Sequence, residues 1–476
     1  MGVRKYFSMV LSLLLVIGVI AGCSSNVSTD KATGTSTTSP TSAPAQKVKI
    51  EVWTSNRSDK AVREQLIKKY NETNKDNIEI DYRIFTDNYP DQLKLALNAN
   101  QLPDLIFNPT SDLYNAGKLL NIKDWLTDNV RKRFTAAAFD PIPWVKPGDV
   151  PFIKENVTNF KLVYNKDLFK ASGLDPEKPP TTWQEMRDDA KIITQKGGGK
   201  KFGLGLPLKQ SVFWTYYVQV PAARSGDVYG QNGWNAKLGK FDFAPYSKYL
   251  QWWIDVNKDG SVFPGVGTYD NDMIRAQFSE GNVGMLSAAS WDIGVFTDQF
   301  PAKIDWGVAD FPTWDGKVKG GARYDTSGGI AVNSTSPHLE EAKKVWQFFT
   351  SDEMYTEMTK SGLGTYSNVA SLAPEVQNKD RKGFAGFSIT QPAKSYPPQP
   401  ISDFKLINPP LKVGKVDIIG FGSNWDVMSQ IFFTGKDVDK SMQALTDAYN
   451  KILDENVKAG KLDLSKVTDP NFSPMP

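Results

Sequence analysis

The sequence has very few of the residues on which disulfides, metal sites and nucleophilic catalysis commonly depend. Its 476 residues include one cysteine, Cys23, and one histidine, His338. A single cysteine excludes a disulfide within the chain, and the sequence has neither a pair of histidines nor a G-x-S-x-G turn. We expect His338 to be a solvated residue at the start of a helix. The sequence contains no catalytic set, so we predict that the protein is not an enzyme.

Excess charge of either sign is also absent. The chain has 56 Lys and Arg against 53 Asp and Glu, and without Arg4 and Lys5 it is close to neutral. A nucleic-acid partner would need a basic face, so none is expected. The length favours two lobes over a single core. Thirteen tryptophans suit either large cores or a site where rings stack on a ligand.

The N-terminus reads as a targeting segment. Arg4 and Lys5 precede an apolar run that ends in Ile20-Ala21-Gly22-Cys23, the pattern of a bacterial lipobox. We predict a lipoprotein signal peptide over residues 1–22 and a diacylglycerol (palmitate-type) lipid on Cys23. The alternative is an uncleaved membrane anchor with an incidental thiol. Residues 23–46 are rich in Ser and Thr and predict a flexible lipid-anchored linker, which places the protein at the outer face of the bacterial cell membrane.

Alternating strands and helices follow the linker. Apolar periodicity predicts strands at residues 48–52, 78–82 and 105–107, with helices between them, which is typical of an α/β sheet. Ligands of such sheets bind beyond the carboxyl ends of the strands. Four polar residues are therefore candidates for one binding rim: Asn56, Arg57, Asp87 and Asn108. The alternative for each is a turn residue that caps the next helix.

Residues 160–190 read as a strand, a short helix, a proline-punctuated turn and a second helix. Thr182 is a good N-cap and Glu185 completes a capping box. This stretch resembles the signature of the family 1 extracellular solute-binding proteins, the sugar-binding lipoproteins and periplasmic proteins of bacterial ABC importers. The matching residues are Tyr164, Asn165, Lys166, Asp167, Phe169, Gly173, Leu174, Pro180, Thr182, Trp183 and Glu185.

The resemblance spans roughly residues 47–458. It implies an α/β chain with a two-lobed periplasmic-binding-protein-like fold of type II, in which two Rossmann-like lobes are joined by a hinge. The implied division is lobe one over residues 47–155 and 312–362, and lobe two over residues 156–311 and 363–476.

The resemblance also implies ligand-binding residues. The family's cleft tryptophans fall on Trp291 and Trp425, and the segment where related proteins often place another stacking ring falls on Trp214. Asp292 follows Trp291, and Tyr366 lies in a loop that resembles the family's hinge-region turn. The alternative for the three tryptophans is packing in the core.

The function implied by the resemblance is capture of a carbohydrate, an oligosaccharide, by closure of the lobes and its delivery to an ABC permease. We expect a monomer without a cofactor. Two alternatives remain open: a surface-anchored glycoside hydrolase, which needs only two carboxylates at a suitable distance, and an adhesin or structural lipoprotein on the same fold. Arg57 and Arg323 also leave an acidic ligand open.

Two further segments carry weaker signals. Asp255-Val-Asn257-Lys-Asp259-Gly260 resembles the start of an EF-hand loop, but its twelfth position is Val266, where a bidentate Glu is required. We therefore interpret it as a turn that ends a helix, with a calcium site as the alternative. Residues 391–410 carry six prolines and predict an extended surface loop.

Overall fold

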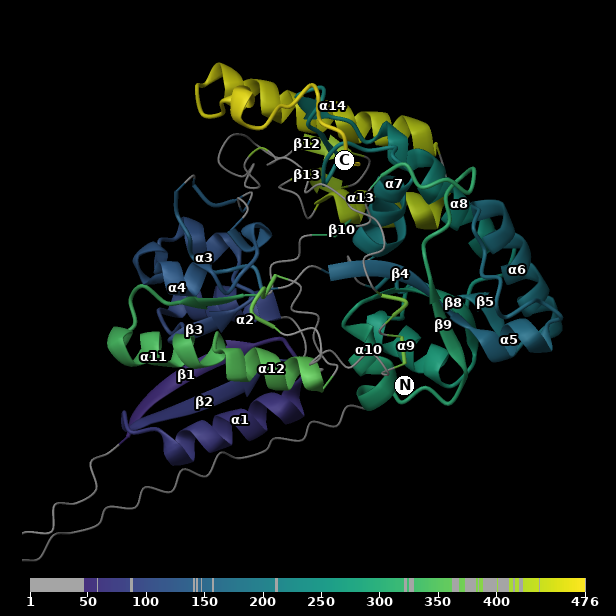
Figure 1. Cartoon of the computed structure of the whole chain (residues 1–476). Coiled ribbons are helices and arrows are strands. Elements are labelled where there is room, and N and C mark those ends of the chain that lie inside the picture. Colours follow the sequence, from purple (N-terminus) through teal and green to yellow (C-terminus); the bar gives the residue numbers. More distant parts are fainter. Residues whose placement is uncertain are drawn as a thin grey trace, which may run out of the picture. The chain divides into compact units, whose positions relative to one another are not determined.

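The computed structural model describes residues 47–57, 59–85, 89–139, 142, 144–146, 148–155, 158–209, 213–320, 323–324, 329–361, 368–372, 382–383, 385–387, 400, 411–413, 416–418, 423–435 and 437–475. The chain from Lys47 onward forms one compact unit built on two larger β-sheets (Figure 1). The predicted proline-rich loop lies outside the described residues, apart from Pro400. Among the described helices, none is both long and apolar enough to cross a membrane.

The first sheet forms from the strands predicted near the N-terminus. Its order is β11-β3-β1-β2, in which β2 and β3 run parallel to β1 and β11 is antiparallel to β3. The alternation of Val48, Ile50 and Val52 with charged residues buries one face of β1. The strands are β1 (Val48–Thr54), β2 (Ile78–Ile84), β3 (Leu105–Phe107) and β11 (Ile330–Val332).

Helices cover this sheet and share its core. Buried side chains of α11 and α12, among them Trp346 and Tyr355, join those of the strands in one apolar cluster. The helices of this part are α1 (Lys60–Thr73), α2 (Tyr89–Ala99), α3 (Ser111–Asn115), α4 (Asp128–Arg131), α11 (Leu339–Phe349) and α12 (Asp352–Lys360). Helix α11 begins at Leu339, and His338, expected at the start of a helix, is its N-cap residue.

The second sheet is mixed. Strand β4 is antiparallel to both of its long neighbours, β8 on one side and β9 on the other, while β5 runs parallel to β8. Strands β8 and β9 therefore run in the same direction and end at the same edge of the sheet. The strands are β4 (Thr158–Asn165), β5 (Phe202–Leu204), β8 (Val283–Ala289), β9 (Trp306–Ala309) and β10 (Arg323–Tyr324).

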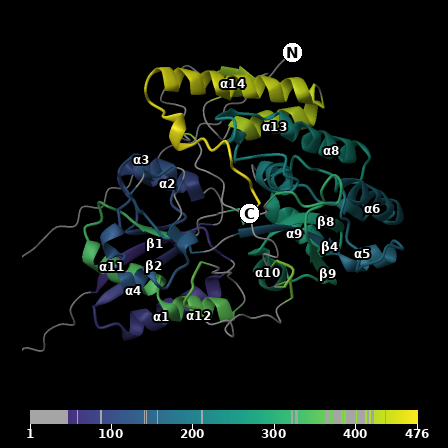
Figure 2. The ribbon, with the colours of Figure 1, turned by 45° about the horizontal axis from the view of Figure 1, so that its top comes forward.

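An aromatic-rich core fills one face of this sheet. Figure 2 shows α13 and α14 beside α8, and buried side chains of all three join that core. The helices of this part are α5 (Lys166–Ala171), α6 (Trp183–Lys196), α7 (Val220–Arg224), α8 (Ser247–Lys258), α9 (Asn271–Ser279), α10 (Asp292–Gly294), α13 (Ser423–Thr434) and α14 (Val438–Lys458). Two small hairpins complete the described strands, β6 (Trp234–Asn235) with β7 (Lys240–Phe241) and β12 (Leu411–Val413) with β13 (Val416–Ile418).

The signature stretch folds as predicted. The Thr182 hydroxyl accepts a hydrogen bond from the Glu185 backbone, and the Glu185 carboxylate accepts one from the Thr182 backbone, which is a complete capping box at the start of α6. Trp183 is buried edge-on against Trp252, with ring centroids 4.7 Å apart. Gly173 ends α5 with φ +83°, a conformation in which only glycine is unstrained.

The expected lobe boundaries need correction. We expected the chain to re-enter lobe one at residue 312, yet β10 pairs with β4 of the second sheet. The chain therefore returns to the first sheet only after Tyr324. Residues 368–372, expected in lobe two, stay with the first sheet, because Val369 joins its core and the Ser371 backbone donates to the Arg133 carbonyl.

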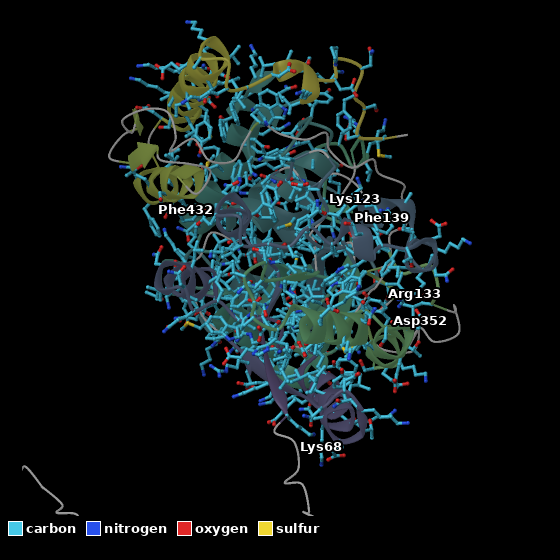
Figure 3. The ribbon with its side chains drawn as sticks, turned by 90° about the vertical axis from the view of Figure 1, so that its left-hand side faces the viewer. Lys68, Lys123, Arg133, Phe139, Asp352 and Phe432 are labelled. Carbon is cyan, nitrogen blue, oxygen red and sulfur yellow. The ribbon has the colours of Figure 1, made fainter. Side chains whose placement is uncertain are left out.

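Contacts between distant segments hold the first sheet's helices together. Arg133 forms an ion pair with Asp352 at 2.8 Å and donates to the Thr350 carbonyl at 2.5 Å (Figure 3). Local sequence patterns could not predict this contact, because Arg133 and Asp352 are 219 positions apart in the chain.

Glu155 lies buried just before the chain enters the second sheet. Its carboxylate accepts a hydrogen bond from the Tyr355 hydroxyl at 3.0 Å. Burial raises the pKa of Glu155 to about 7 from 4.5, and the charge of Arg63 opposes that rise. The neighbouring Asp59 is paired with Arg63 at 2.6 Å. The protonated form of Glu155 is thus the one that fits the fold.

This predicts a pH-dependent stability. An acid whose pKa is higher in the folded state stabilises the fold at low pH, and this contribution is lost as pH rises from about 4.5 to about 7. Replacing Glu155 by Gln should raise the free energy of unfolding at about pH 8 by roughly 3 kcal/mol and change little at about pH 4.5. Urea unfolding across this range measures the effect. Glu357→Gln, at an exposed site, is the control, and parallel pH profiles for wild type and E155Q would contradict the prediction.

Candidate functional site

The carboxyl ends of the first sheet present a small polar cluster. Asn56 follows β1 and Asn108 follows β3, and the Asn108 amide donates to Asn56 Oδ1 at 3.0 Å. Asn108 has φ +50°, which Asn tolerates better than most residues, and its backbone N–H donates to the Gly329 carbonyl at 3.0 Å. The structure thus brings together two of the predicted rim residues through the side-by-side packing of β1 and β3.

The second sheet presents aromatic rings at the edge where β8 ends. Trp291, two residues past β8, is half-buried, and its ring lies edge-on to Phe160 with centroids 5.6 Å apart. Tyr216 is also partly exposed and lies 4.6 Å from Phe160 and 6.3 Å from Trp291. Trp291 and Tyr216 form a ring platform, each with part of its surface open to solvent.

Tyr216 was not among the predicted site residues. It belongs to the aromatic segment that begins at Phe213, which the structure forms as a π-helical stretch, Trp214–Gln219, running on into α7. The sequence marks this segment as aromatic. Which of its rings reaches the surface depends on the π-helical winding, because wider turns place side chains differently from an α-helix.

Four charged side chains, each paired with the next, connect the loop after β1 to the turn after β8. Arg57, after β1, forms an ion pair with Asp272 of α9. Asp272 also contacts Arg275 at 3.0 Å, and Arg275 forms an ion pair with Asp292, directly after Trp291. The series alternates in sign, so each group has an opposite charge beside it. It ties the loop after β1 to the end of β8.

Asp292 is at the buried end of this series. Its carboxylate accepts a hydrogen bond from the Ala289 backbone at 2.8 Å, which fixes the turn after β8. Burial raises the pKa of Asp292, and the charge of Arg275 opposes the rise. Asp292 has no exposed surface. We expected Asp292 to contact the ligand, but it is buried and instead holds the turn that carries Trp291.

Trp214 is also placed away from solvent. Only 3% of it is exposed, and its ring packs on Tyr246 with centroids 4.6 Å apart. The alternative considered for the tryptophans, core packing, describes Trp214.

Several predicted residues lie outside what the structure describes. These are Asp87, Tyr366 and Cys23, together with the side chains of Trp425 and Arg323. The backbone of Trp425 belongs to α13 and that of Arg323 to β10. Their assignments stay as predictions.

The EF-hand-like segment serves the packing of α8. Asp255 accepts a hydrogen bond from Gln251 one helical turn earlier at 2.7 Å. Asp259 pairs with Arg187 of α6 at 2.7 Å and with Lys191 at 3.2 Å. No group of three or more metal-binding side chains occurs among the residues that the structure describes. The interpretation as a helix-ending turn accounts for these contacts.

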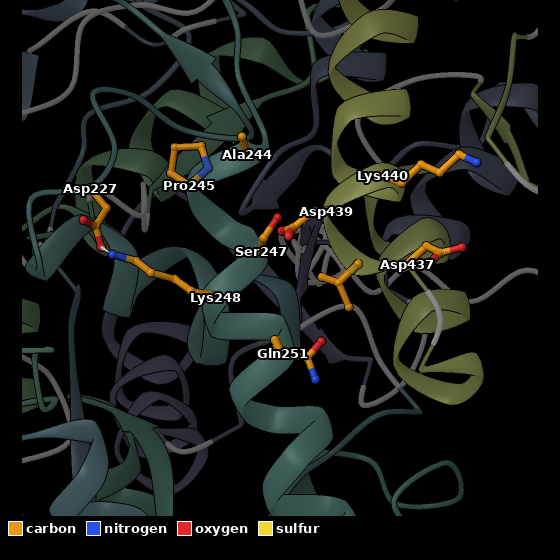
Figure 4. Close-up of a pocket in the computed structure, with 10 residues that line it drawn as sticks. Asp227, Ala244, Pro245, Ser247, Lys248, Gln251, Asp437, Asp439 and Lys440 are labelled. Carbon is orange, nitrogen blue, oxygen red and sulfur yellow. Dashed lines mark ion pairs between the residues drawn. The ribbon is translucent and has the colours of Figure 1, made fainter.

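A separate surface hollow lies between the starts of α8 and α14 (Figure 4). It has a volume of about 890 Å³, and an ion pair between Asp227 and Lys248, 2.7 Å apart, forms part of its wall. None of the predicted site residues lines it. Its charges are of both signs, so it gives no clear ligand class.

The chemistry of the two rims suits recognition of a polar ligand. Aromatic faces offer apolar area to the C–H groups of a ring, and Asn side chains supply directional donors and acceptors. No Ser–His or Cys–His pair is available in the sequence to activate a nucleophile. The two rims thus have the chemistry of a ligand-binding site on two α/β sheets.

Comparison with known proteins identifies the family. A model of the family described as "Bacterial extracellular solute-binding protein" matches residues 54–356, and the chain belongs to that family. It shares the two-lobed fold of periplasmic sugar-binding proteins. The maltose/maltodextrin-binding domain MalE of Bdellovibrio bacteriovorus, solved with maltotriose, matches with a TM-score of 0.63 and 18% identity, over 86% of this chain and 100% of that one.

Curated relatives match part of the chain. A protein of Brucella abortus (strain 2308) named as a binding protein is 28% identical over 225 residues, 44% of this chain and 52% of the relative. The sn-glycerol-3-phosphate-binding periplasmic protein UgpB of the same strain is 30% identical over 182 residues, 36% of this chain and 39% of the relative. The matched part thus spans about half the length of these relatives or less.

The buried pair behind Trp291 gives a stability prediction. Asp292→Asn removes the buried one of the two carboxylates that pair with Arg275, leaves only the more exposed Asp272, and should lower the free energy of unfolding by about 3 kcal/mol. Thermal and urea unfolding measure the loss. Glu280→Gln, which breaks the exposed pair with Lys303 (2.7 Å), is the control and should change stability by about 1 kcal/mol or less. Equal losses in the two variants would show that the buried pair has no special role.

Proposed function

We propose that this extracellular solute-binding protein captures a carbohydrate, an oligosaccharide, between its two sheets and delivers it to an ABC permease. The observation that carries the proposal is the ring platform of Trp291 and Tyr216 at the carboxyl end of β8, together with the Asn56–Asn108 cluster at the matching end of β1 and β3. A sugar presents apolar faces and hydroxyl groups at once, which suits this combination.

The capture step in this proposal is hinge closure. The lobes in the proposal are residues 47–155 with 329–372, built on the first sheet, and residues 158–324 with 382–475, built on the second. A ligand that contacts both rims shifts the population towards the closed form by its differential affinity for that form. The permease would then recognise the closed form.

Support for a sugar also comes from relatives. MalE of Bdellovibrio bacteriovorus is described as bound to maltotriose, although a likeness at 18% identity shows the fold alone. The UgpB relatives bind glycerol phosphate by name, which makes a phosphorylated ligand the outcome that would redirect the proposal. No observation favours catalysis, so we propose a binding protein and not a hydrolase.

The ligand class is tested by thermal shift and calorimetry. The purified protein is screened with neutral oligosaccharides, including maltotriose and raffinose, and with glycerol 3-phosphate. A neutral sugar should raise the melting temperature with no product formed. Stabilisation by glycerol phosphate alone, or turnover of the sugar, would contradict the proposed function.

Trp291 is tested in the same assay. Trp291→Ala removes the stacking surface and should weaken binding of the sugar by about tenfold or more, because aromatic contacts contribute about 1 kcal/mol beyond their buried area. Trp314→Ala is the matched control, since Trp314 is a partly exposed tryptophan that stacks on Trp183 and is not part of the ring platform. An unchanged dissociation constant for W291A would remove the platform from the site.

Anchoring through Cys23 is proposed from the lipobox pattern. Cys23→Ser removes the thiol that would carry the lipid, so the protein should move from the membrane fraction to the soluble fraction of cells. Immunoblots of the two fractions measure the shift, with wild type as reference. A variant that stays with the membrane would point to an uncleaved anchor helix.

A further inference from the structure

Strand β2 forms one edge of the first sheet. Among the described strands only β1 pairs with it, so the other side of its backbone has no strand partner there. An edge of seven residues offers a row of N–H and C=O groups with which a strand of another molecule could pair. Two asparagine side chains, one in the last turn of α1 and one at its C-cap, change what this edge offers.

Asn71 and Asn74 take the place of a neighbouring strand along the first half of the edge. Asn71 Oδ1 accepts from the Ile80 N–H at 2.8 Å, and Asn71 Nδ2 donates to the Ile80 carbonyl at 3.1 Å. Asn74 makes the same two bonds with Ile78, at 3.1 Å and 2.9 Å. An amide carries both an acceptor oxygen and donor N–H groups, so one side chain satisfies both backbone groups of a residue.

The edge remains accessible from outside the sheet. A hollow of about 430 Å³ lies beside it, and its lining includes Asn71, Ile80 and Tyr82. Ile78 and Ile80 are 0% and 4% exposed, so leaving their backbone groups without partners would destabilise the fold. No described side chain pairs with the backbone of Tyr82 or Ile84 in this way. The two asparagines are thus the groups that close this edge.

Strand β2 is complementary in charge to a second copy of itself. In an antiparallel pair with a twofold axis at Asp81, Glu79 of each copy lies opposite Arg83 of the other, and both side chains are exposed. Asp81 would meet Asp81 of the second copy. Within its own chain Asp81 pairs with Lys49 at 2.9 Å and with Arg83 at 2.7 Å, which reduces the repulsion.

Every hydrogen-bonded pair in that register includes a residue that an asparagine already occupies. Backbone groups alternate in direction along a strand, so the outward-facing groups belong to Ile78, Ile80, Tyr82 and Ile84. Ile80 would pair with Tyr82 of the second copy and Ile78 with Ile84, each twice by symmetry. Asn71 blocks the first kind of pair and Asn74 blocks the second. Two side chains therefore close the whole edge to self-pairing.

We propose that Asn71 and Asn74 keep the edge of β2 closed to a second copy of this chain, and that the protein is a monomer for this reason. The edge is a latent surface for association by strand addition, and its partner is the same strand of another copy. The proposal does not depend on which ligand the protein binds.

The double variant Asn71→Ala/Asn74→Ala tests the proposal. Analytical ultracentrifugation of the purified protein over a concentration series measures its mass, in a reducing buffer because Cys23 could link two copies. Wild type should keep the mass of a monomer, whereas the double variant should approach twice that mass as its concentration rises. Asn450→Ala is the matched control. Asn450 makes the same two bonds, both at 2.8 Å, with Phe241 of β7, a strand of only two residues, so N450A should stay a monomer.

Charge changes on β2 test the register. Added to the double variant, Arg83→Glu places like charges opposite each other at Glu79 of the second copy and should abolish the association. Glu79→Arg added to that triple variant brings back opposite charges and should restore the association. Association that is insensitive to these changes would come from unfolded chains and would overturn the proposal.

Asn71→Ala alone is the milder variant if the double variant does not fold. It opens only the two pairs nearest the twofold axis, so it should associate more weakly, and hydrogen exchange of the Ile80 N–H should become several-fold faster. A monomer mass at all concentrations for the folded variants, or a wild type that is already a dimer, would overturn the proposal.

Discussion

The ion pair between Arg275 and Asp292 fixes the turn on which the aromatic side of the candidate site is built. Arg275 belongs to α9 and Asp292 follows β8, so the pair fastens a helix to the carboxyl end of a strand. Asp292 also binds the Ala289 backbone. Trp291 lies between these two fixed points. Its ring can remain half-exposed because the backbone on either side is held from within, and an exposed ring otherwise has little to define its position.

Further ion pairs connect Arg275 to the first sheet. Asp272 contacts both Arg275 and Arg57, so the loop after β1 is connected to the support of Trp291. A ligand that contacts both rims acts on groups that are already coupled. The proposed capture by closure would use this coupling, because a ligand bound at either rim would act on both sheets.

The charges around the rims are almost all paired within the protein. Arg57 is paired with Asp272, Asp292 is satisfied from two sides, and Asp310 carries two cations behind it. What the two rims leave partly exposed is the ring platform and the Asn56–Asn108 cluster, and these two features carry the proposed function.

Much of this protein follows from the sequence by local rules. The capping box of Thr182 and Glu185, the alternation in β1 and the strand at Leu105–Phe107 depend on neighbours in the chain, and each forms as predicted. The signature around Tyr164 identified the family. The ends of β1 and β3 placed Asn56 and Asn108 together, since adjacent parallel strands end at one edge.

The remaining features depend on contacts between distant residues. Sequence patterns do not distinguish Trp214 from Trp291, because both are aromatic residues near the end of a predicted element. Packing against Tyr246 buries the first, whereas the turn held by Asp292 leaves the second half-exposed. The partnership of Arg57 with Asp272 spans 215 residues, and no local periodicity indicates it. Local patterns in the chain were enough to identify the family, the first three strands and the polar residues at their ends. Which rings and charges reach the rim depends on the folded chain, because burial and ion pairing are set by segments far apart in the sequence.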